Sequence, residues 1–133
     1  MIKTAVITIS DRGSQGKRID KTGPEIENIL NKSKYEVVYY RIIPDEIEDI
    51  KRELCYVCDK LKVNLALTNG GTGFSNRDVT PEATLKVIEK NVPGIAEAMR
   101  MRSMEITPRA MLSREVCGIR RNSLIDYYNK TLV

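Results

Sequence analysis

The sequence of 133 residues contains no histidine and no tryptophan, and it has a single phenylalanine. The missing histidines exclude Ser-His-Asp and Cys-His catalysis within one chain, because the commonest general base is absent. Any metal ion must then be held by carboxylates or thiolates, and proton transfer falls to Asp, Glu, Lys, Tyr or Cys. The scarcity of aromatic side chains argues against a surface that stacks nucleic-acid bases.

Long apolar runs are also missing, and none approaches the ~20 residues that a membrane helix needs. Residues 1–9 alternate apolar and polar side chains and lack the continuous apolar core of a signal peptide. We therefore expect a cytoplasmic protein that has no membrane partner.

The three cysteines are an odd number, which favours free thiols in a reducing compartment. Two of them form the motif Cys55-Tyr56-Val57-Cys58. A zinc site would need a second pair or histidines, and the sequence has neither. Because the motif falls inside a helical pattern, we expect its thiols to pack in the core.

The composition is typical of a soluble globular domain, with 41% hydrophobic and 30% charged residues. We expect residues 1–133 to form a single domain. The formal net charge is +4, and the excess lies in residues 100–133, where six arginines and one lysine meet only three carboxylates. This basic segment is either a solvated surface or a site for an anionic partner.

The apolar pattern predicts five strands. They lie at residues 3–9, 35–43, 63–68, 116–120 and 123–125. Helical segments follow each of the first three strands, so that strand and helix alternate over the first ninety residues. This order predicts an α/β protein with three layers, α/β/α, built on an open and mostly parallel sheet.

Four helices are predicted, and they begin near Thr22, Asp45, Thr80 and Ile95. At the second of them, Asp45-x-x-Glu48 resembles a capping box. The third carries the apolar residues Leu85, Val87 and Ile88.

A glycine-rich loop, Gly70-Gly71-Thr72-Gly73, follows the third predicted strand directly. Glycine adopts positive φ at little cost and lets backbone N–H groups close on a ligand. The loop is therefore either a phosphate-binding nest or a tight strand-to-helix turn. It is neither a Walker A motif nor a dinucleotide fingerprint. Because ligands of open parallel sheets bind at the carboxyl ends of the strands, we favour the nest.

Asp45 and Asp78 are the candidate metal ligands. Asp45 follows the second strand, and Asp78 lies five residues after Gly73. Together they could hold Mg²⁺, with phosphate oxygens and water completing the coordination. Either carboxylate could instead only cap a helix or a turn, and the spacing does not decide between these roles.

The segment from Thr68 to Thr84, Thr-Asn-Gly-Gly-Thr-Gly-Phe-Ser-Asn-Arg-Asp-Val-Thr-Pro-Glu-Ala-Thr, resembles the signature of the MogA/MoaB family of molybdenum cofactor biosynthesis proteins. Related molybdopterin-binding domains occur in gephyrin. The resemblance extends in order to Ser10-Asp11-Arg12, Ile43-Pro44-Asp45-Glu46, Val92-Pro93-Gly94, Glu97-Ala98-Met99-Arg100 and Leu112-Ser113-Arg114. It covers about residues 3–125 and implies the three-layer fold of that family.

The resemblance implies molybdopterin adenylyl transfer, in which ATP and molybdopterin give adenylyl-molybdopterin and pyrophosphate with Mg²⁺. The family's two essential acidic positions match Asp45 and Asp78, which we expect to be catalytic and to bind the metal. We expect substrate binding at Ser10, Asp11, Gly70, Gly71, Thr72, Gly73, Arg77 and Ser113. The resemblance also implies a homotrimer or hexamer that works with other proteins of the cofactor pathway, and no nucleic acid.

The resemblance ends after Ile125, where the family continues with Asn-Leu-Pro-Gly-x-Pro and a closing helix. Here residues 126–133 read Asp-Tyr-Tyr-Asn-Lys-Thr-Leu-Val. We expect an incomplete C-terminal strand and helix, exposed apolar surface, and a segment 126–133 that is poorly packed or lies at a subunit contact. The alternative to an active enzyme is a module that binds molybdopterin or nucleotide without transfer. A nucleic-acid binder, suggested only by the basic residues 100–133, ranks third.

Overall fold

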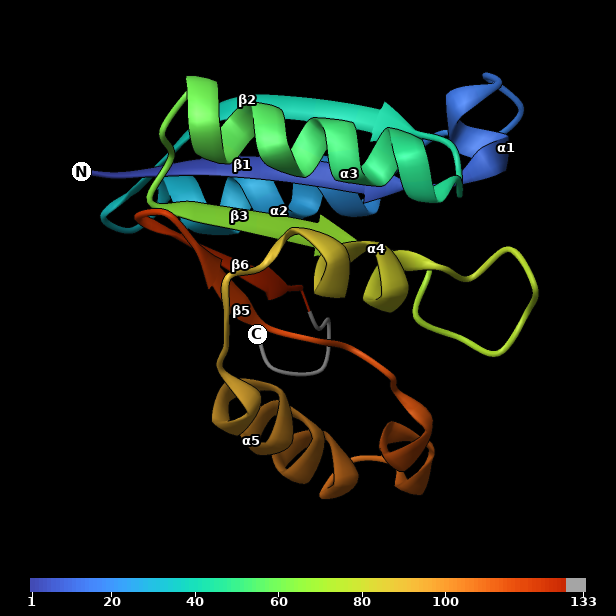
Figure 1. Ribbon diagram of the computed structural model, residues 1–133. Coiled ribbons are helices and arrows are strands. Elements are labelled where there is room, and N and C mark those ends of the chain that lie inside the picture. The colour runs from blue at the N-terminus through green and yellow to red at the C-terminus, as the bar shows by residue number, and fades with distance from the viewer. Residues whose placement is uncertain (129–133) are drawn as a thin grey trace.

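The computed structural model describes residues 1–128, which form a sheet flanked by helices (Figure 1). Within these residues the strands are β1 (Ile2–Ile9), β2 (Tyr35–Ile43), β3 (Leu65–Asn69), β4 (Lys90–Asn91), β5 (Gly118–Arg120) and β6 (Ser123–Tyr127). The helices are α1 (Asp11–Ser14), α2 (Thr22–Asn31), α3 (Ile47–Cys55), α4 (Thr80–Val87) and α5 (Pro93–Met104), with a π turn, η1 (Tyr56–Lys60), and a 3-10 turn, η2 (Pro108–Leu112).

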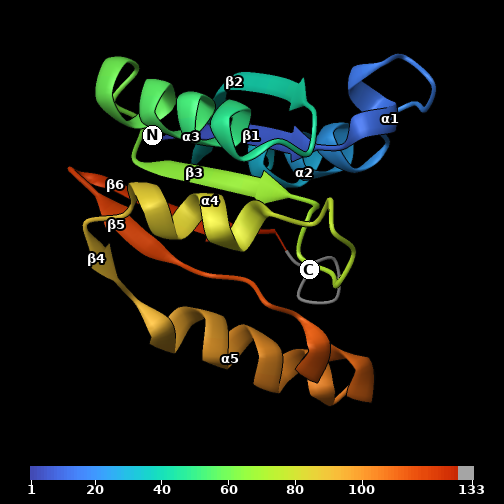
Figure 2. The same ribbon diagram turned by 45° about the vertical axis from the view of Figure 1, so that its right-hand side comes forward.

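The sheet has the strand order β2-β1-β3-β6-β5-β4. Strands β2, β1, β3 and β6 are parallel, whereas β5 pairs antiparallel with both β6 and β4. Helices α3 and α4 cover one face of the sheet, and α2 covers the other (Figures 1 and 2). The predicted three-layer α/β fold with a mostly parallel sheet is confirmed. The carboxyl ends of β1, β2 and β3 meet at one edge, beside α1 and the loop before α4.

The larger core lies between the sheet and α3 and α4. It contains Ile7, Ile50, Leu54, Val57 and Ala66, all fully buried. Ile50, Leu54 and Val57, at spacings of 4 and 3, therefore form the buried face of α3 and the π turn that follows it.

The motif Cys55-Tyr56-Val57-Cys58 lies where α3 passes into the π turn. Cys58 is buried and Cys55 is half-buried, and both are free thiols that pack against the larger core. The prediction of core packing is confirmed.

One predicted detail of the helices, the capping box that begins at Asp45, is wrong. The residue that precedes α3 is Glu46, and it makes no side-chain capping bond. In α4 the buried face consists of Thr80, Ala83, Thr84 and Val87, at the spacing of one helical stripe. Leu85 falls on the opposite side and is half exposed.

The C-terminal segment is packed as far as the structure describes it. Strand β6 pairs with β3 up to Tyr127, and the backbone N–H of Tyr128 donates to the carbonyl of Thr68. Tyr128 also packs against the smaller core under α2, which contains Val6 and Leu67. Residues 126–128 are therefore not loose, and residues 129–133 lie outside the described part of the chain.

Helix α5 and η2 pack on each other away from the main layers (Figure 1). This lobe carries five exposed apolar side chains, Met101, Met104, Ile106, Met111 and Leu112. No helix within residues 1–128 combines the length and the apolar character needed to span a membrane.

Candidate active site

Asp45 is bonded to the first strand end rather than to its own helix. Its backbone N–H donates to Oδ1 of Asp11 at 3.0 Å, and its Oδ2 accepts from the backbone N–H of Asp11 at 2.9 Å. This reciprocal pair ties the ends of β1 and β2 together. The proposed capping role of Asp45 is therefore wrong, because the side chain accepts from a residue 34 positions earlier in the sequence.

Arg77 holds the same two strand ends from the outside. Its guanidinium donates to both carboxylate oxygens of Asp11, at 2.9 and 3.0 Å, and pairs with Glu46 at 2.8 Å. The hydrogen bond from Arg77 lowers the pKa of Asp11. Of the predicted substrate-binding residues, Asp11 and Arg77 are thus brought together and bonded to one another, so their visible task is to fix the position of Asp45.

The glycine loop needs glycine at its first two positions. Gly70 and Gly71 have φ of +105° and +75°, where L side chains are strained. A Cβ on Gly71 would collide with Oγ1 of Thr80 and lie 3.3 Å from Oδ1 of Asp45. Thr80 in turn donates to the carbonyl of Gly70 at 2.8 Å. The loop therefore lies directly against both Asp45 and the start of α4.

The backbone N–H groups of Gly71, Thr72 and Gly73 have no hydrogen-bond acceptor within residues 1–128. Three successive N–H groups without a protein acceptor are available to an anion, and an anion-binding nest requires such donors. A simple turn would need only the hydrogen bonds that the loop carbonyls accept. The N–H groups without an acceptor therefore favour a phosphate-binding nest.

Asp78 meets the loop from the other side. Its Oδ2 accepts from the backbone N–H of Ser75 at 2.9 Å, and a Cβ on Gly73 would come within 2.8 Å of the same oxygen. Burial raises the pKa of Asp45, and the negative charges of Asp11 and Asp78 raise it further. The charge of Asp78 is therefore one of the causes of the raised pKa of Asp45.

No cluster of three or more His, Cys, Asp or Glu side chains within residues 1–128 is arranged to hold a metal ion. Two carboxylates are nevertheless what Mg²⁺ uses when substrate phosphates and waters supply the other oxygens. The negative charges of Asp11 and Asp78, which raise the pKa of Asp45, are also a setting that a divalent cation relieves. The residues at this site fit such a cation.

A cavity of about 680 Å³ opens beside the glycine loop, at the end of β1. It is lined by Thr8, Ile9, Ser10, Gly13, Lys17, Arg18, Ile19, Asp20, Lys21, Thr22, Asn69 and Gly70. Ser10, a predicted substrate-binding residue, lines this cavity and also caps α1 by accepting from the N–H of Gly13 at 3.0 Å. The sequence analysis missed the three cations of the lining, Lys17, Arg18 and Lys21. Their clustering in the segment between α1 and α2 was a signal of an anion-binding surface.

Asp20 anchors the cavity-lining segment. Its Oδ1 accepts from the N–H groups of Thr22 and Gly23, both at 3.1 Å, at the start of α2. Its Oδ2 accepts from the hydroxyls of Thr8, at 2.8 Å, and Tyr40. Burial raises the pKa of Asp20, but these four hydrogen bonds outweigh it and the net pKa is lowered. The carboxylate is therefore an ionised structural anchor rather than a ligand.

The opposite side of the glycine loop faces β6 and the segment before β5. The hydroxyl of Thr72 lies 3.4 Å from that of Tyr127. The hydroxyl of Ser113 donates to Oε2 of Glu115 at 3.1 Å. Glu115 is buried, and burial raises its pKa. Thr72 and Glu115 line one small cleft, so the structure brings the neighbourhood of Ser113 close to the glycine loop.

A family model described as a probable molybdopterin binding domain matches residues 5–125. The match spans most of the chain and includes nearly all of the site residues described above. The chain belongs to this family.

Named members of the molybdopterin-binding family are similar over nearly all of the chain. The molybdopterin adenylyltransferase of Helicobacter pylori is 43% identical over 126 residues, which make up 93% of this chain and 72% of that relative. The Escherichia coli K12 protein of the same name is 42% identical over 127 residues, 93% of this chain and 65% of the relative. The crystal structure of the molybdopterin biosynthesis enzyme MoaB from Thermus thermophilus superposes with a TM-score of 0.90 at 42% identity, covering 96% of this chain and 80% of that one.

Proposed function

We propose that the chain is a molybdopterin adenylyltransferase of molybdenum cofactor biosynthesis, which joins the AMP portion of ATP to molybdopterin. The observation that carries the proposal is the convergence of Asp45, Asp78 and the unpartnered N–H groups of Gly71–Gly73 at one edge of the sheet. Membership of the family and the names of its similar members support the same activity.

The 680 Å³ cavity is the proposed site of the nucleotide. Its lining carries Lys17, Arg18 and Lys21, and only one carboxylate, Asp20, whose oxygens are all engaged by protein donors. Such a surface suits a triphosphate, which carries several negative charges. Gly70 lies at the boundary between this cavity and the carboxylates, which supports placing the α-phosphate at the glycine loop.

Molybdopterin is proposed to approach from the other side of the loop, where Thr72 and Ser113 lie. An oxygen of its terminal phosphate attacks the α-phosphorus of ATP and forms a new P–O bond. The bond from the α-phosphorus to the oxygen that bridges it to the β-phosphorus breaks, and pyrophosphate leaves with that electron pair. A phosphate monoester is already largely deprotonated at neutral pH, since its second pKa is about 6, so the reaction needs no histidine base.

Transfers of this kind depend on alignment and charge neutralisation more than on covalent help from the protein. Asp45 and Asp78 would hold Mg²⁺, which when bound supplies a positive charge to the phosphate oxygens. The N–H groups of the glycine loop orient those oxygens, and Arg77 keeps the strand ends that carry Asp45 in place.

The proposal is tested by Asp45→Asn and Asp78→Asn, assayed for adenylyl-molybdopterin. Each variant is expected to lose at least about a hundredfold in kcat, the loss seen when one charge-stabilising group is removed from an active site. Binding of molybdopterin should persist, because it is assigned to Thr72 and Ser113. Undiminished turnover of Asp78→Asn would show that Asp78 is not a catalytic residue. Asn76→Ala, in the same loop, is the matched control.

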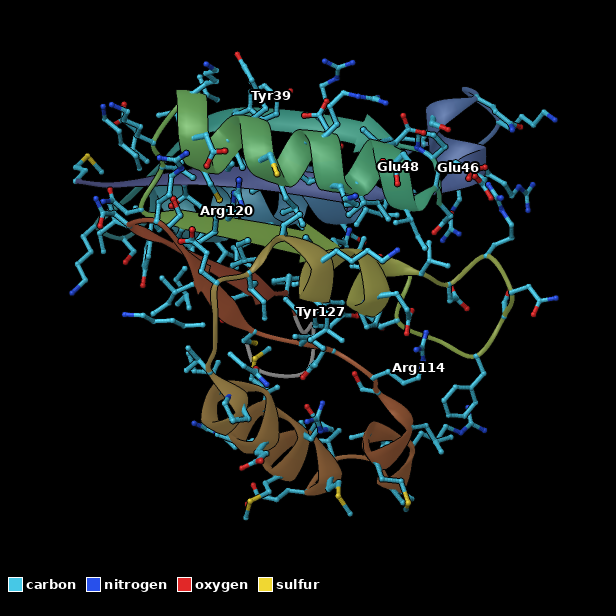
Figure 3. All side chains as sticks on the ribbon, in the orientation of Figure 1. Tyr39, Glu46, Glu48, Arg114, Arg120 and Tyr127 are labelled. Atoms are coloured by element: carbon cyan, nitrogen blue, oxygen red, sulfur yellow. The ribbon has the colours of Figure 1, made fainter. Side chains whose placement is uncertain are left out.

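A second candidate function is a module that binds both ligands without transfer. The observation in its favour is Tyr127 (Figure 3), which is half-buried and whose hydroxyl lies 3.4 Å from that of Thr72. Tyr127 lies in the segment where the family resemblance places its Asn-Leu-Pro-Gly-x-Pro motif. Calorimetric binding of molybdopterin and ATP by the wild-type chain, together with an absence of product, would favour this module.

A further inference from the structure

We propose that Arg114 is a positioning residue that clamps the loop of residues 73–78 and so sets the place of Asp78 relative to the segment that carries Ser113. The inference rests on the proposed function for its kinetic consequence, but the clamp itself is tested without it. Arg114 comes from the segment between η2 and β5 and extends toward α4 and the loop before it (Figure 3).

The guanidinium of Arg114 bonds both ends of the loop at once. Its Nε donates to the carbonyl of Gly73 at 2.9 Å, and its Nη2 donates to the carbonyl of Asp78 at 2.8 Å. Its Nη1 pairs with Oε2 of Glu82 in the first turn of α4 at 2.6 Å. The hydrogen bond from Arg114 lowers the pKa of Glu82, which favours the ionised form of that carboxylate.

Residues 73–78 are mostly exposed and have little core contact of their own. Inside the loop, the carbonyl of Ser75 accepts from the N–H of Asp78 at 3.0 Å, and the N–H of Ser75 donates to the carboxylate of Asp78 at 2.9 Å. These bonds fix Asp78 relative to Ser75. Arg77 attaches the loop to the strand ends through Asp11 and Glu46. The two carbonyl bonds from Arg114 attach it to the segment that carries Ser113.

Only an arginine can make this set of contacts. The planar guanidinium presents donors in several fixed directions, and here it reaches two carbonyls and a carboxylate. A lysine carries a single ammonium at the end of a flexible stem, so it would keep the charge toward Glu82 and lose at least one carbonyl.

The clamp joins the two sides of the proposed site. Arg114 lies between Ser113 and Glu115, and the backbone carbonyls of those two neighbours accept from Arg100 at 3.4 and 3.1 Å. The segment is thus anchored to α5 on one side and to the loop of Asp78 on the other. A substrate held at Ser113 and a carboxylate held at Asp78 are therefore aligned through one side chain.

The test compares Arg114→Lys and Arg114→Gln with the wild-type chain by amide hydrogen exchange. Exchange should speed up by at least about tenfold at Ser75, Arg77 and Asp78, whose N–H groups have acceptors within the loop. In the transfer reaction, kcat should fall by about ten- to a hundredfold and the Mg²⁺ concentration for half-maximal rate should rise, while the KM for ATP changes little.

The matched control is Arg120→Lys. Arg120 makes the same kind of contacts, two to the carboxylate of Asp59 and one to the carbonyl of Val87, at the opposite end of the sheet (Figure 3). The Arg120→Lys substitution should lower thermal stability about as much as Arg114→Lys does. It should not alter amide exchange in residues 73–78 or the Mg²⁺ dependence of the transfer rate.

Three results would overturn the proposal: unchanged loop exchange in both Arg114 variants, a loss of kcat without faster exchange, or equal kinetic losses in Arg114→Lys and Arg120→Lys. If Arg114→Gln fails to fold, Glu82→Gln removes the ionic partner and is expected to speed exchange in the same three amides to a smaller degree. If the wild-type chain has no transfer activity but amide exchange in the loop is faster in the Arg114 variants, the clamp is supported and the proposed function is rejected.

Discussion

Asp45 is a carboxylate whose position favours function over stability. Burial and the charges of Asp11 and Asp78 raise its pKa above the ordinary 3.8. A raised carboxyl pKa means that the folded state binds the proton more tightly than the unfolded state, so the ionised group destabilises the fold at neutral pH. That cost disappears as the pH falls toward 3.8.

We therefore expect Asp45→Asn to be more stable than the wild-type chain at pH 7 although it is inactive. The asparagine carbonyl can still accept from the N–H of Asp11, so the strand ends remain joined. Thermal unfolding at a series of pH values checks this, and the stability gained should shrink as the pH is lowered. A variant less stable than wild type at pH 7 would mean that the ionised carboxylate is favourable to folding.

Gly71 combines positive φ with a close approach to two side chains. Gly71→Ala should cost roughly 1–2 kcal/mol from the backbone alone, and more from the collision with Thr80. Binding of molybdopterin and ATP should weaken together. Gly16→Ala is the control, because Gly16 has a similar φ of +73° and nothing within 4 Å of the added Cβ. If binding is unchanged while stability falls, the loop is a turn without a ligand.

Asp20 anchors the end of the segment between α1 and α2 that leads into α2. Its lowered pKa means that this anchor stabilises the fold above the ordinary pKa of 3.8 and loses that effect as the pH falls through the lower folded value.

Tyr40→Phe removes one of the four donors to Asp20. We expect a loss of about 1–2 kcal/mol in the free energy of unfolding by urea at pH 7, and a higher KM for ATP because the cations of the segment are held less firmly. Tyr56→Phe, which changes a partly exposed ring outside the cavity, should do neither. Equal KM values for ATP in the wild type and Tyr40→Phe would show that this segment takes no part in nucleotide binding.

Elements were predictable from the sequence where periodicity decides them. Strand β2 was predicted at 35–43 and forms there, because a run of β-branched and aromatic residues is bounded by turn residues. The role of Asp45 could not be read from its spacing to Glu48. The same pattern suits a helix cap, and only the approach of the Asp11 N–H, at the start of α1, gives Asp45 its actual partner.

In the folded molecule, residues that no local sequence pattern connects come into contact. The glycine loop and Asp78 were found because they lie in one contiguous motif at a strand end. The cations of the cavity and the clamp of Arg114 were missed, since both depend on how irregular segments fold back on the sheet. No period in the sequence encodes such long-range contacts.

The exposed apolar residues of α5 and η2 bear on oligomeric state. Because surface of this kind is costly to leave in water, and because the family resemblance implies trimers or hexamers, we predict a homo-oligomer. Sedimentation equilibrium over a range of concentrations measures the mass directly. Met101→Glu should shift the distribution toward monomer if the lobe of α5 and η2 lies at the contact. A wild-type chain that stays monomeric at all concentrations would contradict the prediction.

The most direct test of adenylyl transfer is to incubate the wild-type chain with molybdopterin, ATP and Mg²⁺ and to quantify both products by liquid chromatography and mass spectrometry. Adenylyl-molybdopterin and pyrophosphate should form in equal amounts over many turnovers, and omission of molybdopterin should abolish pyrophosphate release. A folded chain that binds both substrates but yields neither product would contradict the assignment of this site as an adenylyltransferase.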